Sequence, residues 1–145
     1  MTVQKESLIV RPLSAAETGL VPDWCDKVEE ELEGDIELSK LDFSYCPVHD
    51  GEDGVNGDTM LVRAKAEAAM GTLGFGKIIL DLHEQGKDVV PPEVQVVILP
   101  CTILRRRGGD RSVPYLYRRG AQLVLNFFWL GYDFSRRARL VRPRE

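Results

Sequence analysis

The chain has 145 residues, 43% of them hydrophobic and 29% charged, with a formal net charge of −4 at pH 7. This composition is typical of a globular domain and excludes fibrous and disordered classes, and the length fits a single domain over residues 1–145. The longest apolar-rich run, residues 121–130, is about half the ~20 residues of a membrane-spanning helix, so we expect no membrane span.

The charge is divided unevenly along the chain. Residues 1–93 hold 8 Lys/Arg against 20 Asp/Glu, a net −12, whereas residues 94–145 hold 11 against 3, a net +8. Every basic residue after Lys87 is an arginine, whose planar guanidinium binds phosphates, carboxylates and aromatic faces in ways that lysine does not. We therefore divide the domain into an acidic mixed α/β part, 1–93, and a basic β-rich part, 94–145.

The first elements are short. Residues 7–11 are mostly β-branched or apolar and predict a strand that Pro12 ends. Ser14 and Glu17 have the S-x-x-E spacing of a capping box, which predicts a short helical turn.

Residues 22–33 are predicted to form a strongly acidic amphipathic helix. Pro22 suits its first position, and Gly34 its C-cap. One face would carry Trp24, Val28 and Leu32, which follow one another at intervals of four, and the opposite face would carry acids.

The next segment predicts a strand and a loop. Apolar and polar residues alternate over residues 35–45, as on a half-buried strand with a break near Lys40. Residues 47–58 are acidic and rich in glycine, and we expect a loop there.

Two further helices are predicted before the basic part. Asp58 is placed to cap an alanine-rich helix over residues 59–70. Residues 77–84 fit both strand alternation and helical spacing; we favour a helix, because Gly86 then serves as its C-cap, but the strand stays open.

After residue 93 the pattern is that of strands. Pro100 predicts a bulge or an edge position within the strand over 94–104, and residues 105–111 suit a hairpin loop. Strands follow over 113–119, over 122–130 and in a last stretch ending near residue 141; the gaps are too short for crossover helices, so the sheet should be antiparallel. The expected fold class is α+β, with two or three helices packed on one face of a mostly antiparallel sheet formed largely by residues 94–142.

The candidate binding surface lies in the basic part. Arginines and aromatics on a sheet can follow a phosphate backbone and stack unpaired bases, but acids of the same chain or of a second copy can also pair with them, and net acidity disfavours indiscriminate nucleic-acid binding. We predict a small non-enzymatic interaction module that binds a protein partner or itself, as a dimer, with binding of RNA or another single-stranded nucleic acid as the alternative. The candidate site residues are Arg105, Arg106, Arg107, Arg111, Arg118, Arg119, Arg136, Arg137, Tyr115 and Tyr117.

Two short motifs suggest other chemistry. Cys46 and His49 have a C-x-x-H spacing and are the candidate metal ligands, although structural zinc sites usually offer two such pairs. Asp81 and His83 would share a face on a strand and diverge on a helix, so a metal-dependent hydrolase around His83 is a third hypothesis that depends on that choice. No catalytic residue and no cofactor is predicted.

The compartment is expected to be cytoplasmic. The N-terminal residues lack the charged and apolar regions of a secretory signal. Cys25, Cys46 and Cys101 are odd in number and widely spaced, which suits a reducing compartment better than a disulfide framework.

Overall fold

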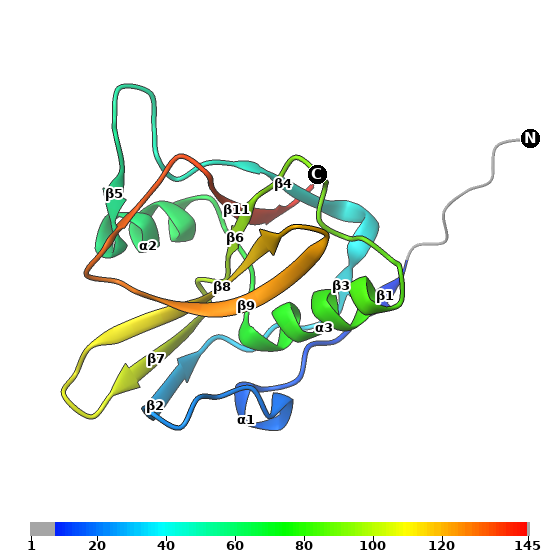
Figure 1. The fold of residues 1–145 in the computed structure, drawn as a ribbon, viewed down its shortest axis with the longest axis horizontal. Helices are drawn as coiled ribbons and strands as arrows, with labels where there is room; N and C mark the ends of the chain where they lie inside the picture. Colours follow the sequence, from blue (N-terminus) through cyan, green and yellow to red (C-terminus); the bar gives the residue numbers. More distant parts are fainter. Residues whose placement is uncertain (1–7, 145) are drawn as a thin grey trace, which may run out of the picture.

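The computed structural model describes residues 8–144 (Figure 1). The strand expected over residues 7–11 is present as a strand of two residues. Ser7, the first residue of the predicted range, lies outside the described residues. The elements are, in order, β1 (Ile9–Val10), α1 (Ala15–Thr18), β2 (Cys25–Glu30), β3 (Ile36–Glu37), a 3₁₀ turn η1 (Leu38–Lys40), β4 (Leu41–Tyr45), β5 (Val55–Asn56), α2 (Gly57–Ala66), α3 (Leu73–Glu84), β6 (Val96–Ile98), β7 (Thr102–Arg106), β8 (Arg111–Arg119), β9 (Gln122–Trp129), β10 (Asp133–Phe134) and β11 (Ala138–Pro143).

Within the described residues, seven strands form the main sheet, in the order β2-β7-β8-β6-β11-β4, and β9 pairs with the remaining side of β8. Each pairing is antiparallel except that of β11 with β6. The α+β class and the mostly antiparallel sheet are therefore confirmed. The expectation that the last strand would also be antiparallel throughout is wrong, because residues 130–137 carry the chain across the molecule and return it beside β6 in the same direction (Figure 1).

Pro100, expected to mark a bulge or an edge position within one strand over 94–104, instead lies in a turn that separates two strands. β6 pairs with residues 115–117 of β8 and β7 pairs with residues 111–112, so the two short strands share one side of β8 with a bend between them. On either side of Pro100, the Leu99 N–H donates to the Pro114 carbonyl at 2.9 Å and the Cys101 N–H to the Gly71 carbonyl at 2.9 Å. The predicted hairpin loop after β7 is also present.

The core is divided between the two faces of the sheet. Consecutive strand residues point to opposite faces, and Val97 belongs to a cluster with Ile79 of α3 whereas Ile98 belongs to a second cluster with Met60 of α2. The same alternation separates Leu140 from Val141 on β11. Helix α3 therefore packs on one face of the sheet and α2 on the other, whereas we expected the helices on a single face.

The segment predicted as an acidic helix, residues 22–33, is instead the strand β2, so that prediction is wrong. A helix would have placed like charges four residues apart, which is unfavourable. As a strand, β2 pairs with β7 and Glu29 meets Arg105 across the sheet. Intervals of four fit a strand as well as a helix, and Leu32, expected on the buried stripe, is 71% exposed.

The helical reading of residues 77–84 is confirmed, since α3 covers them and begins earlier, at Leu73. Its N-cap is Thr72, and Glu33 accepts bonds from the Gly71 N–H at 2.8 Å and the Thr72 N–H at 3.0 Å. Gly86 follows the last turn with φ +78°, as its predicted role at the helix end requires. Among residues 8–144, no helix is long and apolar enough to cross a membrane.

The ends of the other helices differ in detail from expectation. The capping box of α1 is confirmed. α2 ends at Ala66 instead of residue 70, and its N-cap is Asn56, whose side chain accepts from the Thr59 N–H at 2.8 Å, instead of Asp58. Asp58 lies inside the first turn of α2.

Candidate functional site

Several of the candidate arginines pair with acids of the same chain. Arg105 contacts Glu29 at 2.6 Å, and Arg111 contacts Asp58 at 2.6 Å. Arg142, outside the candidate set, makes a third such contact with Asp42 at 2.8 Å. The acidic and basic parts of the sequence therefore meet within one molecule.

Two of these pairs lower the pKa of their carboxyl groups, those of Glu29 and Asp42. The hydrogen bond from Arg105 holds the pKa of Glu29 below its usual value. Hydrogen bonds from Ser44 and from Arg142 lower the pKa of Asp42 to about 2. The carboxylates of Glu29 and Asp42 are thus charged at neutral pH and pair with arginines that would otherwise be free to bind a ligand.

Two more candidate arginines bind backbone carbonyls. The guanidinium of Arg118 donates to the carbonyls of Val94 at 2.9 Å, Val90 at 2.9 Å and Pro91 at 3.0 Å. Arg136 donates twice to the carbonyl of Glu52, at 2.9 and 2.6 Å. Both side chains hold loops in place: Arg118 uses three of the five N–H donors of its guanidinium on the backbone, and Arg136 uses two.

Four candidate arginines remain exposed without an ion pair in the described part of the chain: Arg106, Arg107, Arg119 and Arg137. Arg106 and Arg107 lie at the β7–β8 hairpin, whereas Arg119 ends β8, about 25 Å away at the rise of an extended strand. Arg137 lies in the segment between β10 and β11. The free arginines are therefore dispersed and form no continuous basic track.

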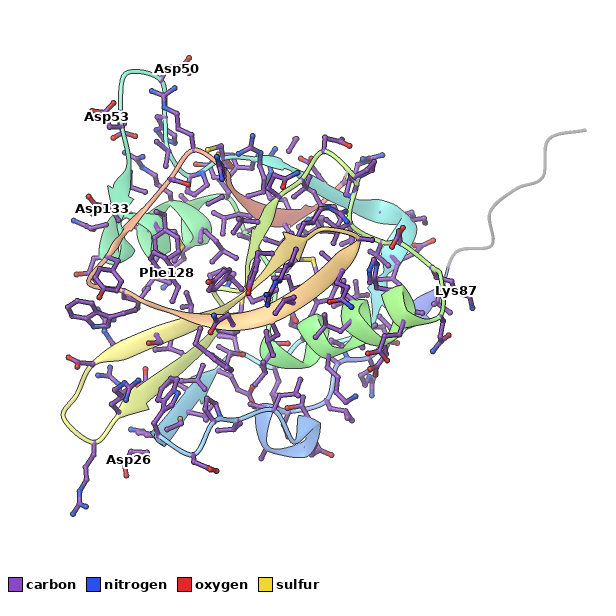
Figure 2. All side chains as sticks on the ribbon, in the orientation of Figure 1. Asp26, Asp50, Asp53, Lys87, Phe128 and Asp133 are labelled. Atoms are coloured by element: carbon purple, nitrogen blue, oxygen red, sulfur yellow. The ribbon has the colours of Figure 1, made fainter. Side chains whose placement is uncertain are left out.

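Tyr115 and Tyr117 lie side by side on the face covered by α2. Their rings are 5.6 Å apart, and Tyr115 also packs edge-on against Phe128 at 5.8 Å. Phe128, labelled in Figure 2, packs in turn against Phe134 at 4.5 Å. Burial raises the pKa of Tyr115. These tyrosines are partly buried members of an aromatic cluster.

A groove of about 490 Å³ opens at the C-terminal end of β9, and we call it the edge groove. The guanidinium of Arg106 lies 4.4 Å from the centre of the Trp24 ring, which packs edge-on against Phe127 at 5.7 Å. Trp129 and Tyr132, 41% and 60% exposed, pack edge-on at 4.8 Å. With one face of its guanidinium against the Trp24 ring, Arg106 still has its N–H donors free to bind a carboxylate or a phosphate.

The edge groove brings together residues that lie far apart in the sequence. Arg106 was among the candidates, and Phe127, Trp129 and Tyr132 lie in the aromatic-rich stretch beside them. Trp24 was missed, because the segment containing it was expected to be a helix facing the core. The register of β2 against β7 accounts for its position, since Cys25 lies opposite Arg106 and brings the preceding Trp24 beside that arginine.

Beside the edge groove, β9 leaves one side of its backbone open. The two-residue turn at Gly120, whose φ is +62°, fits a type II′ hairpin and makes Arg119 and Gln122 the first hydrogen-bonded pair. Alternate residues of β9 from Gln122 therefore bond to β8, and the backbone groups of Leu123, Leu125, Phe127 and Trp129 point outward.

Few of these outward groups have a partner. The Phe127 N–H donates to the side-chain oxygen of Asn126 at 2.8 Å, and the Trp129 carbonyl accepts from the Tyr132 N–H at 3.1 Å. Within residues 8–144 no strand pairs with this edge, and the N–H and carbonyl groups of Leu123 and Leu125 have no hydrogen-bond partner there. β9 is therefore an open edge eight residues long.

The residues of the hydrolase hypothesis lie in other contacts. The α3 helix separates Asp81, which pairs with Lys77 at 2.9 Å, from His83. One ring nitrogen of His83 contacts Asp88 and the other lies 3.0 Å from the Ala121 carbonyl. Both nitrogens thus have partners, and His83 ties the end of α3 to the β8–β9 turn.

The candidate metal ligands do not converge. Cys46 contacts the Arg136 carbonyl at 3.5 Å, and a ring nitrogen of His49 lies 3.0 Å from the Tyr45 hydroxyl. Among the described residues, no group of three or more His, Cys, Asp or Glu side chains is placed to hold a metal ion.

A second cavity, of about 350 Å³, lies between β2 and α2. Of the acids that line it, Glu29 binds Arg105, and Glu30 accepts from the Ala15 N–H at 3.1 Å. Burial raises the pKa of the Cys101 thiol to about 12, so this cysteine is not a nucleophile at neutral pH.

Comparisons of the chain with protein-family models, with curated proteins and with solved structures find no match.

Proposed function

We propose that this protein is an interaction module that binds a protein partner through the open edge of β9 and the edge groove. The observation that carries the proposal is the edge itself, a strand of eight residues with unpaired backbone groups and no charged residue. Soluble proteins usually protect such edges with lysine, proline or a bulge. An unprotected edge beside an aromatic groove is what strand addition of a partner requires.

The chemistry of the surface indicates the chemistry of the partner. The outward backbone groups of Leu123 and Leu125 pair with an extended segment. Phe127 and Trp129 offer apolar surface to alternate side chains of that segment. Arg106 offers a guanidinium that is stacked and therefore held in place, which suits a carboxylate near one end of the partner.

A displayed library of extended peptides tests the proposal. We expect selected peptides to combine alternating apolar residues with an acid, and to protect the amides of Leu123 and Leu125 from hydrogen exchange. Arg106→Ala should weaken such a peptide about tenfold, the size of one charge-assisted hydrogen-bond pair in a groove. Arg137→Ala, another exposed arginine without an ion pair in the described residues, lies between β10 and β11 outside the edge groove and is the matched control. Peptides that bind without protecting the β9 amides would contradict the proposal.

Binding of single-stranded RNA is the second candidate, and the stacked pair of Arg106 and Trp24 is the observation that favours it, since bases stack on such surfaces. The salt dependence of binding to labelled RNA decides it. Two arginines near the edge groove predict about a sevenfold loss of affinity between 50 and 200 mM salt, whereas six phosphate contacts would give a loss of several hundredfold. RNA that fails to bind at the lower salt would remove this candidate.

A further inference from the structure

We propose that the partner on the edge of β9 is a second copy of this chain, whose own β9 pairs antiparallel with the first about a two-fold axis at Asn126. The proposal rests on the proposed function and names its partner. It predicts a continuous sheet in which two β8–β9 hairpins lie edge to edge.

The backbone of β9 is symmetric about Asn126. The outward-facing residues are Leu123, Leu125, Phe127 and Trp129, two on each side of Asn126. A two-fold axis there places Leu125 of one copy opposite Phe127 of the other, and Leu123 opposite Trp129. Every outward residue then faces another outward residue, and the two can exchange backbone hydrogen bonds, with the Trp129 carbonyl accepting a second bond besides that from the Tyr132 N–H. An axis at Leu125 would instead place Trp129 opposite Ala121 in the turn, and the pairing would be shorter.

The side chains of β9 allow this pairing. A two-fold axis brings each strand against its own sequence, so a charge near the axis would meet an identical charge. No residue from Gln122 to Tyr132 is charged. The two hydrogen-bonded cross-strand pairs, leucine against phenylalanine and leucine against tryptophan, are of the apolar and aromatic kind that stabilises sheets.

Asn126 lies at the centre of the pairing. It is exposed, and its side-chain oxygen now accepts from the Phe127 N–H, which occupies one outward donor of the edge. In the pair, that N–H donates instead to the second copy, and the two Asn126 amides lie side by side across the axis. Asn126 thus caps the edge in the single chain and contacts the Asn126 of the second copy in the dimer.

The ends of the hairpin are also complementary. The same register carries the β8–β9 turn of the second copy past Trp129, towards the segment with Tyr132 and Asp133. Asp133 is exposed at that end of β9 (Figure 2). The turn carries Arg119, one of the arginines without an ion pair among the described residues. The pairing brings these opposite charges towards each other twice, once at each end.

The mass in solution as a function of protein concentration and salt tests the proposal. We expect a dimer of the 16.3 kDa chain by sedimentation equilibrium. Its dissociation constant should change less than threefold between about 50 and 500 mM salt, because the paired strands themselves are uncharged and salt screens only the exposed Arg119–Asp133 contacts at the two ends. Association driven by the acidic and basic parts of the chain would instead weaken strongly over this range.

Two lysine variants locate the interface. Asn126→Lys places two like charges at the axis and should raise the dissociation constant at least tenfold. Gln122→Lys makes the same chemical change at an exposed position of the same strand, outside the paired residues, and should leave it within twofold. Equal dissociation constants for the two variants would overturn the assignment of the interface to β9.

Cysteine cross-linking fixes the register. In a background with Cys25 and Cys46 replaced by serine, Asn126→Cys should form a disulfide between copies, because residues opposite each other in a non-hydrogen-bonded pair lie about 4.5 Å apart at Cα. Val124→Cys, two residues from the axis, should not. A cross-link at Val124 and not at Asn126 would overturn the register.

The outcomes separate this proposal from the proposed function. A chain that remains a monomer at both salt concentrations, up to several hundred micromolar protein, overturns the second copy as partner. If that monomer binds selected peptides, and the peptides protect the Leu125 amide from hydrogen exchange, the edge remains a binding site for another protein. If the dimer forms and peptides compete with it, both proposals are supported.

Discussion

Arg118 and Arg119 are adjacent candidate site residues, and replacing each with alanine should give opposite results. Arg119 is exposed at the end of β8 without an ion pair in the described range, so Arg119→Ala should change the free energy of unfolding by less than about 0.5 kcal/mol. Arg118 is partly buried and holds the loop before β6. Arg118→Ala should therefore destabilise the protein although it removes only a charged side chain.

The magnitude follows from the three carbonyls that Arg118 binds, at 2.9, 2.9 and 3.0 Å. A hydrogen bond to a charged group contributes about 1.5–3 kcal/mol in mutational series, but the three are not additive, and water reaches part of the loop after truncation. We expect a loss of about 3 kcal/mol, which lowers Tm by about 6–12 °C in a chain of this size. Arg118→Lys keeps one donor group and should fall between wild type and alanine.

Urea denaturation followed by tryptophan fluorescence measures the difference, with the slope of the transition checked for each variant. The comparison of two neighbouring arginines cancels the loss of a positive charge. Unfolding free energies for Arg118→Ala and Arg119→Ala within 0.5 kcal/mol of each other would refute the structural role of Arg118. If Arg118→Ala weakens binding of selected peptides without changing stability, Arg118 belongs to the candidate binding surface after all.

The remaining predictions concern packing, acid stability and a helix end. Gly74→Ala should destabilise the protein by at least about 2 kcal/mol in urea titration, because the new Cβ would lie 2.0 Å from a backbone carbonyl of the loop before α1. This clash outweighs the ~1 kcal/mol that alanine gains over glycine in a helix. An equal or higher stability would contradict this packing. Hydrogen bonds from Ser44 and Arg142 lower the pKa of Asp42 from 3.8 to about 2, so the contribution of Asp42 to the free energy of unfolding is complete above about pH 4 and is lost as pH falls towards 2. The difference in stability between wild type and Asp42→Asn should therefore close over that range. A constant difference would argue against the pairing. Glu33→Gln removes a carboxylate that accepts three hydrogen bonds at the start of α3 and should cost about 1 kcal/mol, measured as faster amide exchange in that first turn; unchanged exchange would show that the carboxylate is dispensable.

Local patterns favoured a helix over a strand at residues 77–84, indicated an irregularity at Pro100 and predicted the β7–β8 hairpin. A buried helix with a glycine beyond its end, a proline within a strand and a glycine pair between strands each impose a backbone conformation on their immediate neighbours. The prediction for residues 22–33 was wrong because Trp24 and Val28 are spaced for either a helix or a strand. Pairing with β7, over 70 residues later in the chain, decides between them.

The candidate site shows the same division. The sequence predicted that the arginines and aromatics of the C-terminal part lie in one β region, and the hairpins confirm their arrangement on neighbouring strands. Spacing along the chain could not show which arginines remain free, because Arg105 and Arg118 find their partners on other elements. It also could not show that Trp24 joins them from the N-terminal part.

The sequence by itself determined the α+β class, the positions of several turns and helix ends, and the division of charge between the two parts of the chain. These depend on residue type and short-range periodicity. Only the tertiary structure decided that the charges pair within one molecule, that the core lies on both faces of the sheet, and that β9 is left as an open edge. The physical reason is that ion pairs, strand order and edges depend on distances between residues far apart in the chain, and those distances exist only after the sheet has formed.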